Sequence, residues 1–155
     1  MNQGQDLESV ARSIIDTTMY MVLGTADDSG QPWVSPVYFA SADYKQFYWV
    51  SSPEVRHSRN IATRPQVSIV VFDSRAPIGT GQGVYMSAIA EQLTSIELDR
   101  GITIFSQTSL GHGGREWTIR DVQTPTLYRL YRATAQDHWV LDPAGHSDHR
   151  TPVSL

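Results

Sequence analysis

Hydroxyl and cationic side chains gather in the middle of the first half of the chain. They are Ser51, Ser52, Arg56, His57, Arg59 and Arg64. Such side chains can hold a phosphate group through charge-assisted hydrogen bonds. The chain has a formal net charge of −4 at pH 7 and a single lysine, so a local group of cations stands out from its composition. The sequence favours a phosphate site here, and the alternative is a solvated basic helix face.

A helix is expected to position these groups. Pro53 suits the first position of a helix, and Ser51 or Ser52 can cap it. No helix breaker follows before the Arg-Pro pair at 64–65. The N-terminus of a helix carries unpaired N–H groups and a partial positive charge, which favour anions. We therefore expect the two serines, with Arg56 and His57, to hold the phosphate.

Two blocks rich in aromatic and β-branched residues precede this helix. One runs from Gln31 to Ala40 and the other from Phe47 to Ser52, with turn-forming residues at 41–45 between them. We interpret the two blocks as a β-hairpin that leads into the helix. Pro36 lies inside the first block, where it removes one ladder hydrogen bond and predicts an edge or a bulge. Backbone groups near Pro36 are then free to face a ligand.

The rest of the chain predicts further short strands and two more helices. The expected helices are Leu7 to about Asp16, and Thr94 to about Ser109 with a capping box at its start. The expected strands are Met19–Ala26, in a hairpin with the first block, Gln66–Asp73, Val84–Leu93, Thr126–Gln136 and His138–Leu141, the last two paired with each other. A glycine-containing loop covers 74–83, and 142–155 is expected to be a polar tail. This pattern predicts a mainly β protein, an antiparallel barrel of six or seven strands with flanking helices.

Several blocks resemble one known family in their order and spacing. They are Gly24-Thr25-Ala26, Gln31 to Val37, Tyr48 to Ser52, Arg56 to Ile61 and Pro65 to Ile69. These blocks, within roughly Met19 to Leu93, resemble the pyridoxamine 5'-phosphate oxidase-like family of flavin-binding split β-barrels. The resemblance implies a split antiparallel barrel and a homodimer with the cofactor site between its subunits. It also implies FMN as the usual cofactor, with a deazaflavin or, occasionally, haem in its place.

The resemblance also suggests roles for individual residues. Val34, Ser35 and Pro36 would lie along the isoalloxazine ring with Trp33 beside them, and core packing is the alternative for Trp33. Gln82 would give a polar contact to the flavin, and its alternative is an exposed loop amide. Trp117 would reach the partner subunit's flavin, or else anchor the dimer or the core.

The chain departs from the authentic oxidases in two places. Their arginine-histidine substrate motif and C-terminal ending are not visible in 127–155, so oxidation of vitamin B6 is not expected. The lysine common in the family's phosphate helix is replaced by Arg56-His57, and arginine binds phosphate well. We expect an FMN- or deazaflavin-dependent oxidoreductase with a small-molecule substrate, a nicotinamide cofactor as a candidate reductant, and no assigned catalytic side chain. The alternative is a non-catalytic flavin- or deazaflavin-binding protein for storage, sensing or stress protection.

Composition limits the remaining classes of protein and site. At 155 residues the chain is expected to form a single domain over 1–155, and the absence of cysteine excludes disulfides and thiolate sites. The acidic balance argues against nucleic-acid binding, and no apolar run or secretion signal is visible, so we expect a cytoplasmic protein. His146, Asp148 and His149 are of metal-binding types, but nothing fixes their geometry, so no metal site is expected. No Gly-x-Ser-x-Gly elbow indicates a hydrolase.

Overall fold

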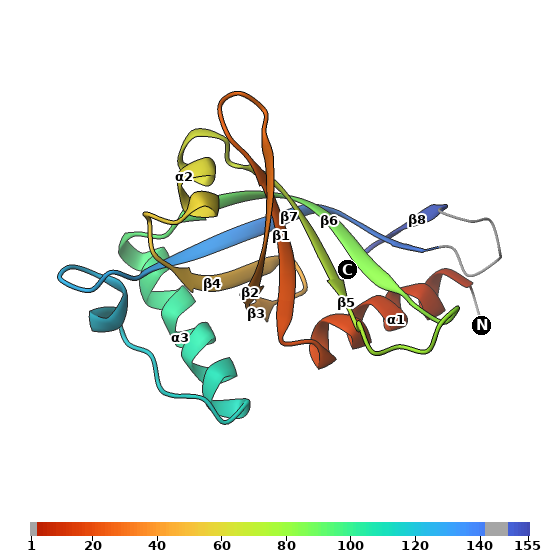
Figure 1. The fold of residues 1–155 in the computed structure, drawn as a ribbon. Helices are drawn as coiled ribbons and strands as arrows, with labels where there is room; N and C mark the ends of the chain where they lie inside the picture. The colour runs from red at the N-terminus through yellow and green to blue at the C-terminus, as the bar shows by residue number, and fades with distance from the viewer. Residues whose placement is uncertain (1–2, 142–148) are drawn as a thin grey trace.

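The computed structural model describes residues 3–141 and 149–155 (Figure 1). Its helices are α1 (Gln3–Thr17), α2 (Arg56–Thr63) and α3 (Ser95–Gly111), with a short 3₁₀ helix η1 (Ile119–Val122). Its strands are β1 (Tyr20–Ala26), β2 (Pro32–Tyr38), β3 (Ala40–Ala42), β4 (Gln46–Ser51), β5 (Gln66–Phe72), β6 (Gly83–Gln92), β7 (Arg129–Leu141) and β8 (Arg150–Val153). Every strand pair in this part of the chain is antiparallel. The predicted fold class, a mainly β split barrel with flanking helices, is confirmed, with eight strands in place of six or seven.

The sheet curls into a half-barrel whose strand order leaves one opening. The order is β2-β1-β5-β6-β7-β4-β3, and β8 pairs with β7 off this path. In the described residues no ladder joins β2 to β4, so the barrel is split between them. Figure 1 shows α2 at the upper left, α3 at the lower left and α1 at the lower right, so the three helices cover different parts of the sheet.

The expected hairpin between the two aromatic blocks does not form. β2 pairs along its whole length with β1, from Tyr20 opposite Tyr38 to Ala26 opposite Pro32. β4 pairs instead with the short β3 and with β7. The backbone N–H of Phe39, between β2 and β3, donates to the carbonyl of Met19, just before the start of β1. The chain therefore changes partner at Phe39, and the two blocks belong to opposite ends of the sheet.

The C-terminal strands also differ from the prediction. The segments 126–136 and 138–141 were expected to pair with each other, but most of their residues form one continuous strand, β7. A register shift against β6 leaves Gln136 as an extra residue, which marks a β-bulge. The expected tail contains β8, which pairs with the end of β7, while its residues 142–148 lie outside the described part.

Two apolar clusters hold the elements together, and β4 belongs to both. Phe47 and Trp49 point into the barrel, where they pack with the side chains that α1 also covers. Tyr48 points the other way, into the cluster beneath α3. Because both faces of β4 are buried, its run of aromatic residues shows no alternation with polar ones.

The N-terminus of α3 lacks the predicted capping box. Thr94 is the N-cap residue but makes no capping hydrogen bond through its side chain. Glu97 bonds instead to Arg132 of β7, which also pairs with Glu91 of β6. Glu97 thus ties the helix to the sheet. None of the helices in the described residues is both long and apolar enough to cross a membrane.

Candidate functional site

α2 begins three residues later than the sequence indicated. Its first residue is Arg56 and its N-cap is Val55, which makes no side-chain capping bond. Ser52 Oγ accepts a hydrogen bond from the backbone N–H of Glu54 at 3.1 Å. This local bond favours a turn over a helix, so Pro53 does not open α2 and neither serine caps it. The predicted capped helix start is therefore wrong.

His57 lies inside the molecule, where the prediction had it facing a phosphate. Its side chain is only 8% exposed. Nε2 lies 2.9 Å from Ser51 Oγ on β4, and Nδ1 lies 3.1 Å from Ser35 Oγ on β2. Burial lowers the pKa of His57, which favours the neutral ring at pH 7. His57 thus offers no free cation, and both of its ring nitrogens are already hydrogen-bonded.

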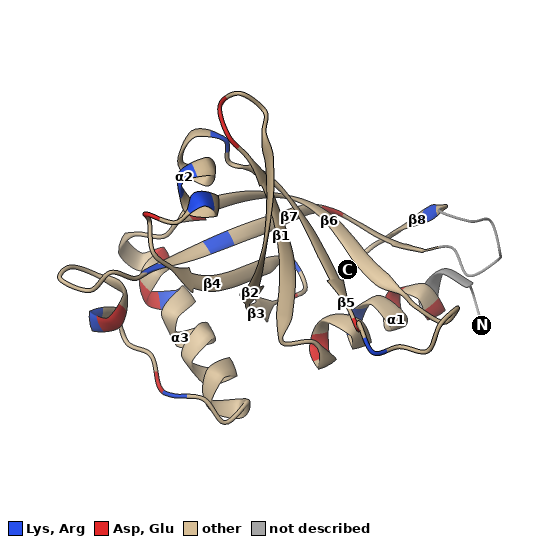
Figure 2. Ribbon diagram, in the orientation of Figure 1, with Lys and Arg blue, Asp and Glu red and all other residues tan. Residues whose placement is uncertain are grey.

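Arg56 is the cation of α2 that remains available. Its guanidinium lies 4.4 Å from the centre of the Trp33 ring, within the range of a cation–π contact. Arg59 is paired with Glu54 at 3.0 Å, and Arg64 donates to the carbonyl of Asp28 at 3.0 Å. Among these three arginines, only Arg56 makes no hydrogen bond or ion pair within the part of the chain that the structure describes. Figure 2 shows basic residues gathered on and just after α2.

α2 is held on the β1–β2 hairpin by a polar contact that the sequence analysis did not single out. Asn60 Nδ2 donates to Thr25 Oγ1 at 3.0 Å, and both side chains are buried. Both residues lie in the sequence blocks that carry the family resemblance, and this is the signal by which the sequence could have pointed to them. The contact ties α2, and with it the residues of its first turn, to β1.

The residues expected along the ring divide between the two faces of β2. Trp33 and Ser35 face α2, where they meet Arg56 and His57. Val34, which is 65% exposed, and Pro36 alternate with them and face solvent. β2 pairs with β1 alone among the described strands, so its second edge carries no ladder. The structure therefore brings Trp33, Ser35, Ser51, Arg56 and His57 together beside an open strand edge.

Gln82 and Trp117 make their contacts elsewhere in this chain. Gln82 Oε1 accepts from the backbone N–H groups of Gly83 and Leu141, and its Nε2 donates to the carbonyl of Leu141. Its amide thus joins the start of β6 to the end of β7. Trp117 packs edge-on against Phe105 of α3 at 5.6 Å between ring centres, with the Arg115 guanidinium 4.1 Å from its ring centre. Within one chain, the Gln82 side chain therefore links two strands by hydrogen bonds, and the Trp117 side chain packs against α3.

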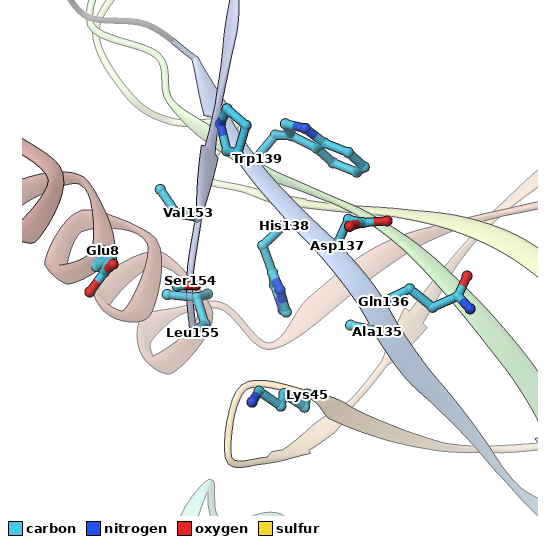
Figure 3. A pocket seen from close by; sticks show the side chains of 11 residues that line it. Glu8, Lys45, Ala135, Gln136, Asp137, His138, Trp139, Val153, Ser154 and Leu155 are labelled. Atoms are coloured by element: carbon cyan, nitrogen blue, oxygen red, sulfur yellow. The ribbon is translucent and has the colours of Figure 1, made fainter.

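A separate hollow opens between α1, the β3–β4 turn, β7 and β8 (Figure 3). Its lining includes Glu8, Lys45 and the buried His138. His138 Nε2 lies 2.7 Å from the carbonyl oxygen of Tyr44, so this nitrogen carries the proton that is donated. None of the predicted site residues lines this hollow. The described residues also contain no group of three metal-binding side chains; His146 and Asp148 lie outside them.

The comparisons with known proteins agree with this architecture. The family model for pyridoxamine 5'-phosphate oxidase matches residues 7–135. The chain therefore belongs to the pyridoxamine 5'-phosphate oxidase family. No curated protein matches its sequence.

Solved structures share the fold at low sequence identity. HutZ, a haem storage protein from Vibrio cholerae, has a TM-score of 0.67 at 20% identity, covering 84% of this chain and 90% of HutZ. A haem-binding protein from Mycobacterium smegmatis has a TM-score of 0.71 at 18% identity, covering 92% of this chain and 55% of that one. An F420 reductase has a TM-score of 0.61 at 15% identity, with coverages of 83% and 94%. The likeness shows a common fold on which proteins named for different cofactors are built.

Proposed function

We propose that this chain binds FMN, with a deazaflavin as the alternative, and acts as an oxidoreductase on a small-molecule substrate. The observation that carries the proposal is the place of Arg56. Arg56 lies above Trp33 at the start of a helix that stands beside the open edge of β2, and within the described part of the chain it makes no ion pair. Both candidate cofactors join a phosphate to a flat ring, and such a molecule needs a cation and a free strand edge close together.

The residues present fit this kind of cofactor. Arginine can hold a phosphate through two parallel hydrogen bonds, and the first N–H groups of α2 lie next to Arg56. The backbone of β2 from Val34 to Pro36 offers hydrogen-bonding groups to the polar edge of a flavin ring, and Pro36 adds an apolar surface. A bound flavin would supply hydride-transfer chemistry, and the protein would supply binding, orientation and exclusion of water.

Two other functions are alternatives to an oxidoreductase: a non-catalytic flavin carrier and a haem-binding protein. A non-catalytic flavin carrier would use the same residues, and the haem-binding structures show that the fold is not tied to flavin. The absorbance spectrum of the purified protein separates flavin or deazaflavin bands from a haem Soret band. Rapid reduction of the bound flavin by a nicotinamide cofactor, followed by reoxidation by an added acceptor, supports the enzyme. A flavin that remains inert supports the carrier, and a Soret band alone contradicts the proposal.

Arg56→Ala tests the phosphate contact. Loss of a charge-assisted hydrogen bond costs about 1.5–3 kcal/mol, so FMN binding is expected to weaken by roughly ten- to a hundredfold. Riboflavin lacks the phosphate and is expected to bind Arg56→Ala and wild type equally. Titrations followed by flavin fluorescence measure both affinities.

Arg59→Ala is the matched control, because it removes an arginine from the same helix whose charge is already paired with Glu54. It is expected to leave FMN affinity within about twofold. Equal FMN affinity in wild type and Arg56→Ala would place the phosphate elsewhere.

A further inference from the structure

His57 joins two strands that the sheet itself leaves unjoined. β2 lies at one end of the strand order, and β4 lies near the other end, followed only by β3. Nδ1 of His57 reaches Ser35 Oγ on β2, and Nε2 reaches Ser51 Oγ on β4. One imidazole ring therefore spans the split of the barrel with a hydrogen bond at each end.

The ring is held where it can act as a rigid spacer. It is almost completely buried, and α2 is fixed in turn by the buried bond from Asn60 to Thr25. A planar ring with two hydrogen-bonded nitrogens fixes the separation of its partners, because neither bond can lengthen without loss of energy. Each serine hydroxyl can donate or accept, so the bridge forms with either neutral tautomer.

We propose that His57 is a positioning residue that sets the width of the opening between β2 and β4, and does not contact the phosphate. The width of this opening decides where the backbone of β2 lies relative to Arg56, and hence whether a ring and a phosphate can be held at once. The binding test of this inference rests on the proposed cofactor function. The second test uses the cofactor-free protein and does not depend on that function.

The binding test compares FMN with riboflavin. If His57 sets the opening, His57→Ala weakens both ligands by the same factor, about tenfold or more, because two buried hydrogen bonds are lost. Arg56→Ala, in contrast, weakens FMN alone. A loss confined to FMN would make His57 a phosphate ligand and overturn the inference. Unchanged affinity for both ligands would overturn it as well.

Conservative variants test the two ends of the bridge separately. An asparagine amide reaches the place of Nδ1 and can keep the bond to Ser35, while a glutamine amide reaches the place of Nε2 and can keep the bond to Ser51. We expect His57→Asn and His57→Gln to bind both ligands with affinities between those of wild type and His57→Ala. Ser35→Ala and Ser51→Ala, which keep the imidazole, serve if His57→Ala does not fold, and each is expected to weaken both ligands alike. Affinities at the level of His57→Ala in both amide variants, or at the level of wild type in both serine variants, contradict the bridge.

Hydrogen exchange on the cofactor-free protein separates a failure of this inference from a failure of the proposed function. In His57→Ala the amides of β2, and those of β4 near Ser51 beyond its pairing with β3, are expected to exchange faster, because the two strands lose their link across the opening. The amides of β6, far from the opening in the strand order, are expected to keep wild-type rates. If the wild-type protein binds no flavin, this comparison still tests the bridge. Unchanged exchange in β2 and β4 then overturns it.

Discussion

Two buried histidines make stability depend on pH at the scale of single residues. Burial lowers the pKa of His57, and burial together with the nearby Lys45 lowers the pKa of His138, whose bond to Tyr44 opposes the change. In the unfolded chain both histidines titrate near pH 6.5. Between the lowered folded pKa and that value the unfolded chain binds more protons, so stability is lost as the pH falls below about 6.5.

Chemical denaturation between about pH 5 and 8 measures this dependence, which is at most about 1.4 kcal/mol per pH unit for each histidine. The free energy of unfolding is expected to level off above about pH 7.5. His57→Gln and His138→Gln are each expected to flatten the curve. Hydrogen bonds from Ser29 and Thr118 are the main causes that lower the pKa values of Asp27 and Asp121. These two carboxyl groups therefore affect stability only at a more acidic pH. A flat wild-type curve between pH 5 and 7 would contradict this prediction.

Sequence patterns identified several residues of the candidate site but not their contacts. The cations and serines between 51 and 64 were visible, and the structure brings Ser51, Arg56 and His57 together with Trp33 and Ser35. In this chain His57 is buried between Ser35 and Ser51, a direction that the sequence did not show because it depends on where this eight-residue helix begins. Gln82 was expected to contact the flavin or solvent. Its hydrogen bonds to Leu141, which lies 59 positions further along the chain, could not be read from a loop motif.

At the scale of elements, α3 packs on the sheet through a glycine. A Cβ atom at Gly101 would lie 2.9 Å from side-chain atoms of Leu130, Leu93 and Tyr48, all of them buried. Gly101→Ala is therefore expected to be net destabilising, by up to about 2 kcal/mol, since overpacking costs about 1–3 kcal/mol and the gain in helix propensity is about 1 kcal/mol. Thermal or chemical unfolding measures the difference.

Gly111→Ala, in the last turn of the same helix, is the control, because a Cβ there has no atom within 4 Å. It is expected to be neutral or slightly stabilising. A stabilised Gly101→Ala would mean that α3 can move away from β4 and β7. The sequence identified this helix but not the close approach of Gly101 to the sheet, because that approach involves residues distant in sequence.

At the scale of the whole molecule, apolar side chains remain uncovered on neighbouring strands. Val34 of β2, Tyr20 of β1 and Phe72 of β5 are all exposed. We propose that a second copy of the chain covers this face, giving a homodimer with the cofactor site at its interface, where Trp117 of one chain could meet the flavin of the other. Exposed apolar patches of this kind mark interaction surfaces.

Val34→Asp is expected to shift the protein towards monomer in sedimentation velocity and to weaken FMN binding in parallel. Ile78→Asp is the matched control, since Ile78 is fully exposed but lies in the β5–β6 loop, away from the paired strands. It is expected to leave the assembly unchanged. A wild-type protein that sediments as a monomer while it binds FMN would contradict the dimer.

The position of β7 near the end of the chain determines when the sheet can be completed during synthesis. Among the described strands, β3 and β4 are joined to the rest of the sheet only through the pairing of β4 with β7, and residues 52–128 separate β4 from β7. During synthesis the apolar side chains of β4, including Phe47 and Trp49, lack their neighbours on β7 until β7 has been made. Pairing across such a distance is slow, and it leaves an aggregation-prone surface exposed in the meantime. The chain should therefore depend on chaperones more during its synthesis than the stability of the finished barrel would suggest.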